Sequence, residues 1–147
     1  MELMDKSETK RFLRRIGDLY GTKKLKFGYV FFKSNKNKVY ICTKESVIGD
    51  DLNPKARGLY FAKFEPVGVR LSLDGAQIIG PLATKNVYSI ENLEEYMSGK
   101  NIECSEKLSN FVIVKCKNDF LGAGLYQKGK IINFVPKERR MKVTLSV

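Results

Sequence analysis

The stretch DFLGAGLYQKGKIINFVPKERR, residues 119–140, joins two apolar runs through a glycine-containing turn and ends in a cationic segment. Apolar residues on either side of Lys128-Gly129 predict a β-hairpin that turns at this dipeptide. Within the first run, Gly122-Ala123-Gly124 lacks the third glycine of a dinucleotide fingerprint and the Gly-Lys-Ser/Thr of a phosphate loop. A glycine pair inside a strand is typical of a site that another backbone or a ligand approaches closely. The stretch therefore predicts a hairpin with one closely approached strand.

Two segments upstream extend this pattern. NFVIVKC, residues 110–116, is rich in β-branched residues and predicts a strand that turns back at Asn118-Asp119. SIENLEEYMSG, residues 89–99, predicts a helix with Ser89 as its N-cap and Gly99 at its end. We therefore expect a helix followed by a three-stranded meander in the C-terminal half.

The segment from Ser7 to Gly21 is helical in pattern, with Ser7 placed as a cap and Gly21 as the stop. Its apolar face carries Phe12, Leu13, Ile16, Leu19 and Tyr20, and its other faces carry Lys10, Arg11, Arg14 and Arg15. These four cations are either a solvated outer surface or a secondary RNA-binding stripe that contacts phosphates.

The region between this helix and the C-terminal half is mostly extended. LKFGYVFFKSNKNKVYICTK, residues 25–44, predicts a hairpin that turns at Ser34–Asn37. A polar segment follows, with one helical turn predicted at Glu45–Ile48. LYFAKFEPVGVRLSL, residues 59–73, resumes the extended pattern.

Many short strands with helices near both ends indicate an α+β fold rather than a doubly wound sheet. The Pro-Val-Gly segment near residues 65–68 predicts a boundary between residues 1–66 and residues 67–147. A last strand is predicted at Lys142–Val147.

Charge points to a polyanionic partner. The 147 residues carry 27 Lys and Arg against 16 Asp and Glu, a net charge of +11. Nucleic acid is the leading partner class. The same excess of positive charge can also reflect solubility, a lysine-rich genomic composition or attraction to anionic lipid. No apolar run reaches the roughly 20 residues of a membrane span, and MELMDKSETK has no signal-peptide core. We expect a cytoplasmic protein with no membrane partner.

The residue types for catalysis or metal binding are sparse. Cys42, Cys104 and Cys116 are widely spaced, with no CxxC pair and no histidine in the chain, so we expect reduced thiols and no metal. Asp50-Asp51 lies in a polar segment and is interpreted as a turn or cap rather than a paired-carboxylate site. We therefore expect no enzymatic activity and no cofactor.

The C-terminal motifs resemble a known RNA-binding module. ENLEEYMSGKNIE, then FVIVKCKNDFLGAG, then KGKIINFVPKERR resemble in order and spacing the C-terminal PUA-like module of the RsmF and Nop/Sun RNA cytosine-5 methyltransferases. The resemblance includes the Leu121–Gly124 turn, the glycine-tipped hairpin, Asn133 and Pro136-Lys137. The chain departs from the family pattern at Leu125, Ile132 and Glu138.

The N-terminal part carries a looser second resemblance. ETKRFLRRIGDLYG, NKVYIC, FAKF and RLSLDGAQIIGP are similar in order to the pre-PUA region and linker of small ribosome-assembly PUA proteins. Together the two resemblances imply a small N-terminal α/β pre-PUA domain packed on a C-terminal PUA-like mixed β-barrel.

The resemblances imply a non-catalytic protein that binds structured RNA, ribosomal or transfer, in ribosome biogenesis, rRNA processing or RNA modification. They place close backbone approach at Gly122 and Gly124 and phosphate contacts at Lys128, Lys130, Lys137, Arg139, Arg140 and Lys142. A catalytic methyltransferase domain would not fit beside these segments, so an RNA methyltransferase or ribosome-assembly factor is a candidate partner.

Alternatives stay open at each of these positions. The cationic run is also explained as lysines that protect a β-edge, and Tyr126 and Phe134 as core residues rather than base-stacking ones. The alternative function is a protein-interaction adaptor that binds RNA weakly, with the acidic segment Glu91–Tyr96 facing its partner. A small-molecule-binding module is a third class.

Overall fold

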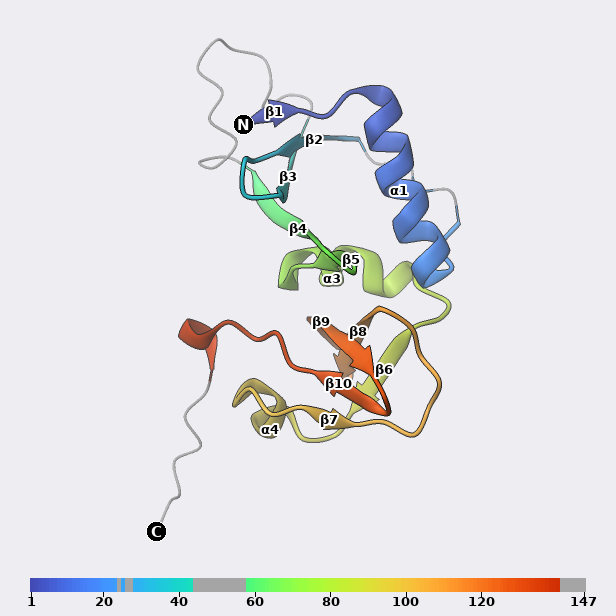
Figure 1. Cartoon of the computed structure of the whole chain (residues 1–147), viewed down its shortest axis with the longest axis vertical. Helices are drawn as coiled ribbons and strands as arrows, with labels where there is room; N and C mark the ends of the chain where they lie inside the picture. Colours follow the sequence, from blue (N-terminus) through green and yellow to red (C-terminus); the bar gives the residue numbers. More distant parts are fainter. Residues whose placement is uncertain (24, 26–27, 44–57, 141–147) are drawn as a thin grey trace.

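Residues 1–23, 25, 28–43 and 58–140 are described by a computed structural model, and within them two five-stranded sheets lie one above the other (Figure 1). The first sheet has the order β1-β2-β3-β4-β5, with every neighbouring pair antiparallel. Its strands are β1 (Glu2–Leu3), β2 (Tyr29–Lys33), β3 (Lys38–Thr43), β4 (Leu59–Glu65) and β5 (Gly68–Leu71).

The second sheet has the order β6-β8-β9-β10-β7. Its first pair, β6 and β8, is parallel, and the other pairs are antiparallel. Its strands are β6 (Val87–Ile90), β7 (Ile102–Glu103), β8 (Phe111–Cys116), β9 (Asp119–Gln127) and β10 (Lys130–Ile132). The predicted meander, with its turn at Lys128-Gly129, is confirmed.

Helix α1 (Lys6–Tyr20) packs on one face of the first sheet. The Phe12 ring lies edge-on to the rings of Phe31 and Phe61, with centroids 5.6 and 6.0 Å apart. The predicted stop at Gly21 is confirmed, because this glycine adopts the left-handed conformation with φ 63°. The cap was assigned wrongly: Asp5 accepts from the Glu8 amide at 2.7 Å, and Ser7 lies inside the helix.

Helix α3 (Leu73–Ile79) and the 3-10 turn η2 (Gly80–Leu82) connect the two sheets. The extended pattern predicted through residue 73 ends at Leu71, because Ser72 caps α3 by accepting from the Gly75 amide at 2.9 Å. Since β5 pairs with β4, the chain leaves the first sheet after Leu71. The predicted boundary at residues 66 and 67 lies in the turn between these strands and stays a prediction.

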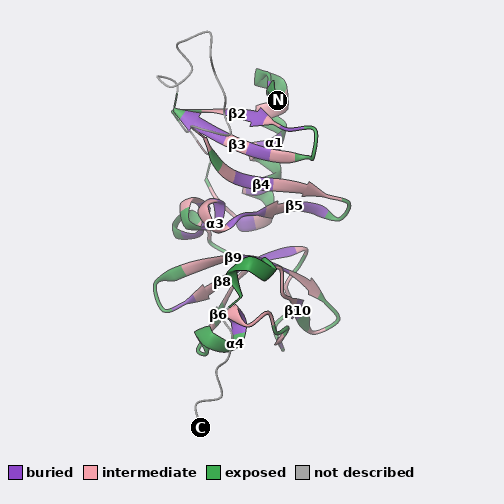
Figure 2. Cartoon of the chain, turned by 90° about the vertical axis from the view of Figure 1, so that its left-hand side faces the viewer, coloured by how far each residue is buried: buried purple, intermediate pink, exposed green. Residues whose placement is uncertain are grey.

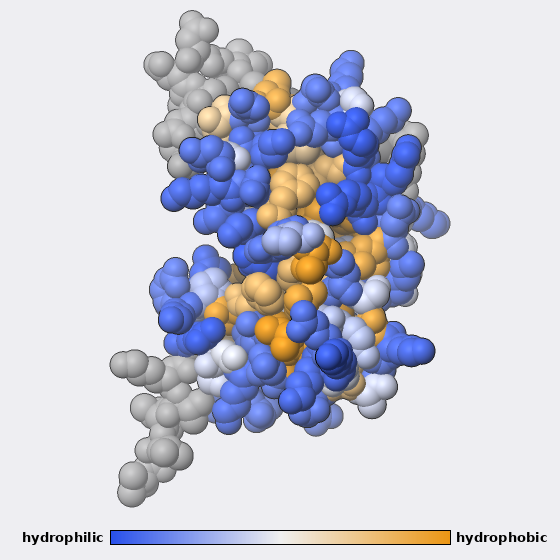
Figure 3. All heavy atoms as spheres, in the orientation of Figure 1, coloured by the Kyte–Doolittle hydropathy of each residue, from blue (hydrophilic) through white to orange (hydrophobic). Residues whose placement is uncertain are grey.

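Strand β8 is buried on both faces. Phe111 and Ile113 contribute to a core shared with α1 and the first sheet, and Val112 and Val114 pack on the other side in a cluster with Tyr96. The apolar side chains visible between the two sheets in Figure 3 lie at this junction, with hydrophilic side chains above and below. The two sheets are therefore joined by a continuous core.

The helix predicted from Ser89 begins later. Residues 87–90 form β6, in which Ser89 lies opposite Lys115 of β8, and helix α4 spans Leu93–Met97. Asn92 is its cap and accepts from the Glu95 amide at 3.0 Å, so Ser89 as N-cap was wrong. Gly99 follows the helix with φ 97°.

A short 3-10 turn, η3 (Lys137–Arg139), ends the described chain. The predicted helical turn at Glu45–Ile48 and the predicted strand at Lys142–Val147 lie outside the described residues. The mixed α and β composition is confirmed, whereas the pre-PUA arrangement of the first sheet stays a prediction. No described helix has both the length and the apolar composition needed to cross a membrane.

Candidate nucleic-acid interface

The two glycines predicted to approach RNA are both buried in β9. Gly122 has φ 110°, and a Cβ placed on it would lie 4.0 Å from the Leu73 backbone at the start of α3. A Cβ on Gly124 would lie 2.5 Å from Ile131 Cγ2 and 2.8 Å from the Ile132 carbonyl oxygen. The positive φ of Gly122 and the close packing of Gly124 against β10 therefore explain these glycines without a ligand, and their approach to RNA stays a prediction.

The predicted C-terminal cations divide into two groups at opposite sides of the module (Figure 1). Lys128 and Lys130 flank the exposed β9–β10 turn, where Lys130 Nζ lies 3.6 Å from Glu103 Oε1. Lys137 and Arg139 are exposed on η3. One surface patch therefore does not hold them all.

Arg140 and Lys142 follow η3. Arg140 Nε donates to the Val135 carbonyl at 3.2 Å, and its side chain lies where a side chain on Gly99 would stand. This contact orients Arg140 along the end of α4. Lys142 lies outside the described residues.

The predicted cations of α1 are all exposed. Arg11 donates to Ser7 Oγ at 2.8 Å on the same helix. Arg15 lies over β4 of the first sheet, with its guanidinium carbon 6.0 Å from the Phe64 ring centroid. Of the four, Arg15 lines a groove, whereas Lys10 and Arg14 stay on the outer surface.

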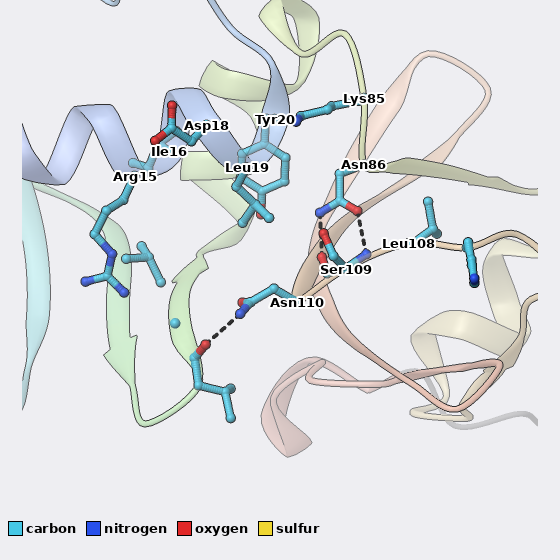
Figure 4. Close-up of a pocket in the computed structure, with 14 residues that line it drawn as sticks. Arg15, Ile16, Asp18, Leu19, Tyr20, Lys85, Asn86, Leu108, Ser109 and Asn110 are labelled. Atoms are coloured by element: carbon cyan, nitrogen blue, oxygen red, sulfur yellow. Dashed lines mark hydrogen bonds between the residues drawn. The ribbon is translucent and has the colours of Figure 1, made fainter.

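That groove, of about 600 Å³, lies at the junction of the two sheets (Figure 4). It is bounded by the C-terminal half of α1, the β4–β5 turn, the segment before β6 and the segment before β8. Its lining includes three cations and one carboxylate: Arg15, Lys85, Lys107 and Asp18. It therefore carries a net positive charge contributed by segments far apart in sequence. The sequence gives no local sign of Lys85 and Lys107, which are isolated lysines in polar segments.

Two asparagines connect the segments that line this groove through side-chain hydrogen bonds (Figure 4). Asn86 Nδ2 donates to the carbonyls of Ser109 and Phe111 at 2.8 and 3.0 Å, and its Oδ1 accepts from the Ser109 amide at 3.1 Å. Asn110 Nδ2 donates to the Val67 carbonyl at 2.6 Å, which ties β8 to the β4–β5 turn. Both asparagines have positive φ, at 61° and 57°, a conformation that asparagine tolerates better than most residues. Because their amides are occupied, the cations are the groups available to an anionic ligand.

Tyr20 closes the inner end of the groove. Its side chain is buried, and its hydroxyl donates to the Phe111 carbonyl at 2.8 Å. Burial raises the pKa of this hydroxyl far above its ordinary value. The Tyr20 hydroxyl is therefore a neutral donor that joins α1 to β8 rather than a base for catalysis.

The described residues contain no group of three His, Cys, Asp or Glu side chains arranged to hold a metal ion. Cys42, Cys104 and Cys116 are free and buried. Burial raises the pKa of the Cys42 thiol, which lowers its thiolate fraction at neutral pH. The groove between the two sheets is therefore suited to binding an anion through its cationic side chains.

Comparison with known families identifies the C-terminal half. Residues 85–141 match the family model described as the PUA domain of methyltransferase RsmF, and no curated protein matches the chain. The match begins at Lys85, on the rim of the groove, and spans the second sheet and η3. Residues 85–141 are a PUA-like module that resembles the C-terminal part of the RsmF and Nop/Sun methyltransferases, and such a module suggests RNA binding.

Proposed function

We propose that this protein binds ribosomal or transfer RNA without catalysing a reaction on it, during ribosome biogenesis or RNA modification. The observation that supports this most is the position of the cationic groove. It lies where the PUA-like module begins, and it is lined by α1, by the β4–β5 turn of the first sheet and by the segments that lead into β6 and β8 of the second. A phosphate backbone is the ligand that suits three cations spread along a groove rather than converging on one point.

The non-catalytic part of the proposal rests on the residues present. The chain has no histidine, and burial raises the pKa values of Cys42 and Tyr20 and that of Tyr96 to about 12. These groups are consequently poor nucleophiles and bases at neutral pH. An RNA that the protein holds would be modified or processed by a separate enzyme, and the protein would act in the cytoplasm.

A binding experiment tests the proposal. Fluorescence anisotropy would measure affinity for labelled ribosomal RNA fragments and transfer RNA across a salt series. The groove variant changes Arg15, Lys85 and Lys107 to Ala, and a charge-matched control changes the exposed Lys6, Lys36 and Lys100 to Ala. We expect the slope of log affinity against log salt to become shallower by about 2 to 3 in the groove variant, since each neutralised phosphate contributes about 0.7 to 0.9. The control should change it far less.

A second function, a protein-interaction adaptor, is favoured by the surface of α4. Glu94 and Glu95 are exposed on α4 and Glu91 just before it, and Leu93 keeps 40% of its surface accessible between them. An exposed leucine among carboxylates suits a basic protein partner better than RNA. Absence of RNA binding at low salt would contradict the RNA proposal and favour the adaptor.

A further inference from the structure

The face of the first sheet that points away from α1, here called the outer face, carries two cross-strand rows of side chains. Lys38, Lys63 and Arg70 lie opposite one another on β3, β4 and β5 and form the cation row. Tyr40 and Tyr60 lie opposite one another on β3 and β4 and form the aromatic pair. On β3 and β5, alternation places Lys38, Tyr40 and Arg70 on the face opposite the buried Val39 and Leu71. On β4, Phe61 is an extra residue at the register shift opposite Val39 and Tyr40, and this shift brings Tyr60 and Lys63 onto that same outer face.

The outer face is the side of the molecule turned to the viewer in Figure 2. Helix α1 lies behind the sheet in this view, and β2 to β5 lie in front of it. Tyr40, Tyr60, Lys38, Lys63 and Arg70 all keep part of their surface exposed. Among the described helices, none lies in front of these strands.

The cation row is unfavourable for the folded protein taken by itself. Like charges directly opposite each other on neighbouring strands destabilise a sheet, and here two such pairs occur in succession. Glu65 compensates in part: its Oε1 lies 3.0 Å from Arg70 Nη2 but 4.0 Å from Lys63 Nζ. Among the described residues, Glu65 thus contacts two of the three cations of this row, and Lys38 lies over the Tyr60 ring. Such an excess is explained if a polyanion supplies the missing negative charge.

The aromatic pair lies directly beside the cation row. The Tyr40 and Tyr60 rings have centroids 5.8 Å apart and an interplanar angle of 43°. Lys38 Nζ lies 5.1 Å from the Tyr60 centroid and covers that ring. A lysine side chain is long and flexible, so it can move from the ring to a phosphate when a base takes its place. Cations interleaved with stacking rings are the arrangement that binds single-stranded nucleic acid.

The outer face continues onto the PUA-like module. Arg70, at the end of the cation row, lies with its guanidinium carbon 5.0 Å from the Phe134 ring centroid. Phe134 precedes η3, where Lys137 and Arg139 are exposed, and η3 lies on the left-hand side of the molecule in Figure 1, the side that faces the viewer in Figure 2. A strand of RNA leaving the outer face would therefore meet further cations of the module.

We propose that the outer face binds an unpaired segment of RNA, with bases stacked on Tyr40 and Tyr60 and phosphates bound by Lys38, Lys63 and Arg70. This inference rests on the proposed function and narrows its substrate class to RNA with an unpaired segment beside the part that the module holds. Stacking on tyrosine is tolerant of base identity, so the outer face favours unpaired over paired RNA without reading sequence.

The test compares two fluorescein-labelled probes: an oligouridine about twelve nucleotides long and a fully paired RNA duplex of the same length. The stacking variant changes Tyr40 and Tyr60 to Leu, and the matched control changes the half-buried Tyr88 of the second sheet to Leu. We expect the stacking variant to lose about tenfold or more in affinity for oligouridine and to keep its affinity for the duplex. The Tyr88→Leu control should bind both probes like wild type.

A second variant keeps the test independent of folding defects. Lys38→Gln combined with Lys63→Gln alters only partly exposed polar side chains, and it should reduce the oligouridine salt slope by about 1 to 1.5. The inference is overturned if wild type prefers the duplex, or if both outer-face variants bind oligouridine as tightly as wild type. If these variants behave like wild type while the groove variant weakens RNA binding, the outer-face inference fails and the proposed function stands. If wild type binds neither these probes nor ribosomal or transfer RNA at low salt, both fail.

Discussion

The second sheet is covered on both faces, whereas the first sheet has a described helix on one face and a polar, aromatic surface on the other. In β8, Val112 and Ile113 point into separate cores, and both are fully buried. In β4, Phe61 is buried against α1, but its neighbour Tyr60 stays partly exposed. A strand buried on both faces can offer a ligand only its turns and edges. The first sheet can offer a whole face, which is why the substrate inference rests there.

The largest loss of stability should come from adding a methyl group inside the second sheet. Gly124→Ala places a methyl group 2.5 Å from Ile131 Cγ2 and against the Ile132 carbonyl, so we expect a loss of about 1 to 3 kcal/mol in the free energy of unfolding. Gly28→Ala is the matched control, because none of the described residues lies within 4 Å of its added Cβ, and it should change stability by less than about 0.5 kcal/mol. Urea unfolding measures both. Equal stability of the two variants would contradict the packing role given to Gly124.

The next effect concerns the hydrogen bond that joins the two halves. Tyr20→Phe removes the hydroxyl that donates to the Phe111 carbonyl at 2.8 Å. That carbonyl keeps Asn86 Nδ2 as a second donor at 3.0 Å, so it is not left unpaired. We therefore expect a loss of about 1 kcal/mol at pH 8 rather than the larger penalty of an orphaned buried group. A loss above about 3 kcal/mol would show that the hydroxyl also positions α1.

The same variant should change the alkaline limb of the stability curve. An unfolded tyrosine ionises near pH 10, whereas burial raises the pKa of folded Tyr20 well above that value. Above pH 10 the unfolded state binds fewer protons than the folded state, so stability that is fully present below pH 10 is lost as the pH rises. We expect wild type to lose up to about 1.4 kcal/mol per pH unit more than Tyr20→Phe in this range. Urea unfolding from pH 8 to 11 measures the slopes, and parallel curves would contradict the assignment.

Local patterns predicted the parts of the fold that are set locally. The β8–β9–β10 meander followed from alternation and from turns at Lys128-Gly129, both readable within a few residues. Strand β6 could not be predicted from local patterns, because it forms through parallel pairing with β8, which places Val87 opposite Ile113. Helix α3 was missed because Asp74-Gly75 has turn composition, although Gly75 is required where the helix packs on the Phe61 backbone.

The candidate sites depended even more on tertiary structure. Arg15 was predicted as a secondary contact, but its partners in the groove, Lys85 and Lys107, come from segments that only the fold brings together. The cation row depends on the β3–β4 register, which shifts between Val39 and Tyr40. A one-residue error in that register would move the row to the buried face, so sequence patterns could not locate it.

The smallest expected effect is that of removing one charge from the cation row of the first sheet, which tests whether this row destabilises the protein in the absence of a ligand. Lys63→Gln removes the central charge of the row, which repels a cation on each side and gains only a 4.0 Å contact with Glu65. We expect the free energy of unfolding to rise by a few tenths of a kcal/mol at low salt, and Lys36→Gln, in the turn outside the strand register, to leave it unchanged. Thermal melts with and without oligouridine would measure this.

The two conditions together separate a structural row from a functional one. Without RNA, relief of repulsion should make Lys63→Gln equal to or more stable than wild type. With saturating oligouridine the order should reverse, because bound RNA stabilises the wild type by an amount that grows with its affinity. A Lys63→Gln protein that is clearly less stable without RNA would mean that the ion pair with Glu65 outweighs the repulsion. The row would then need no anion to explain it, and the contrast between the two sheets would lose its functional meaning.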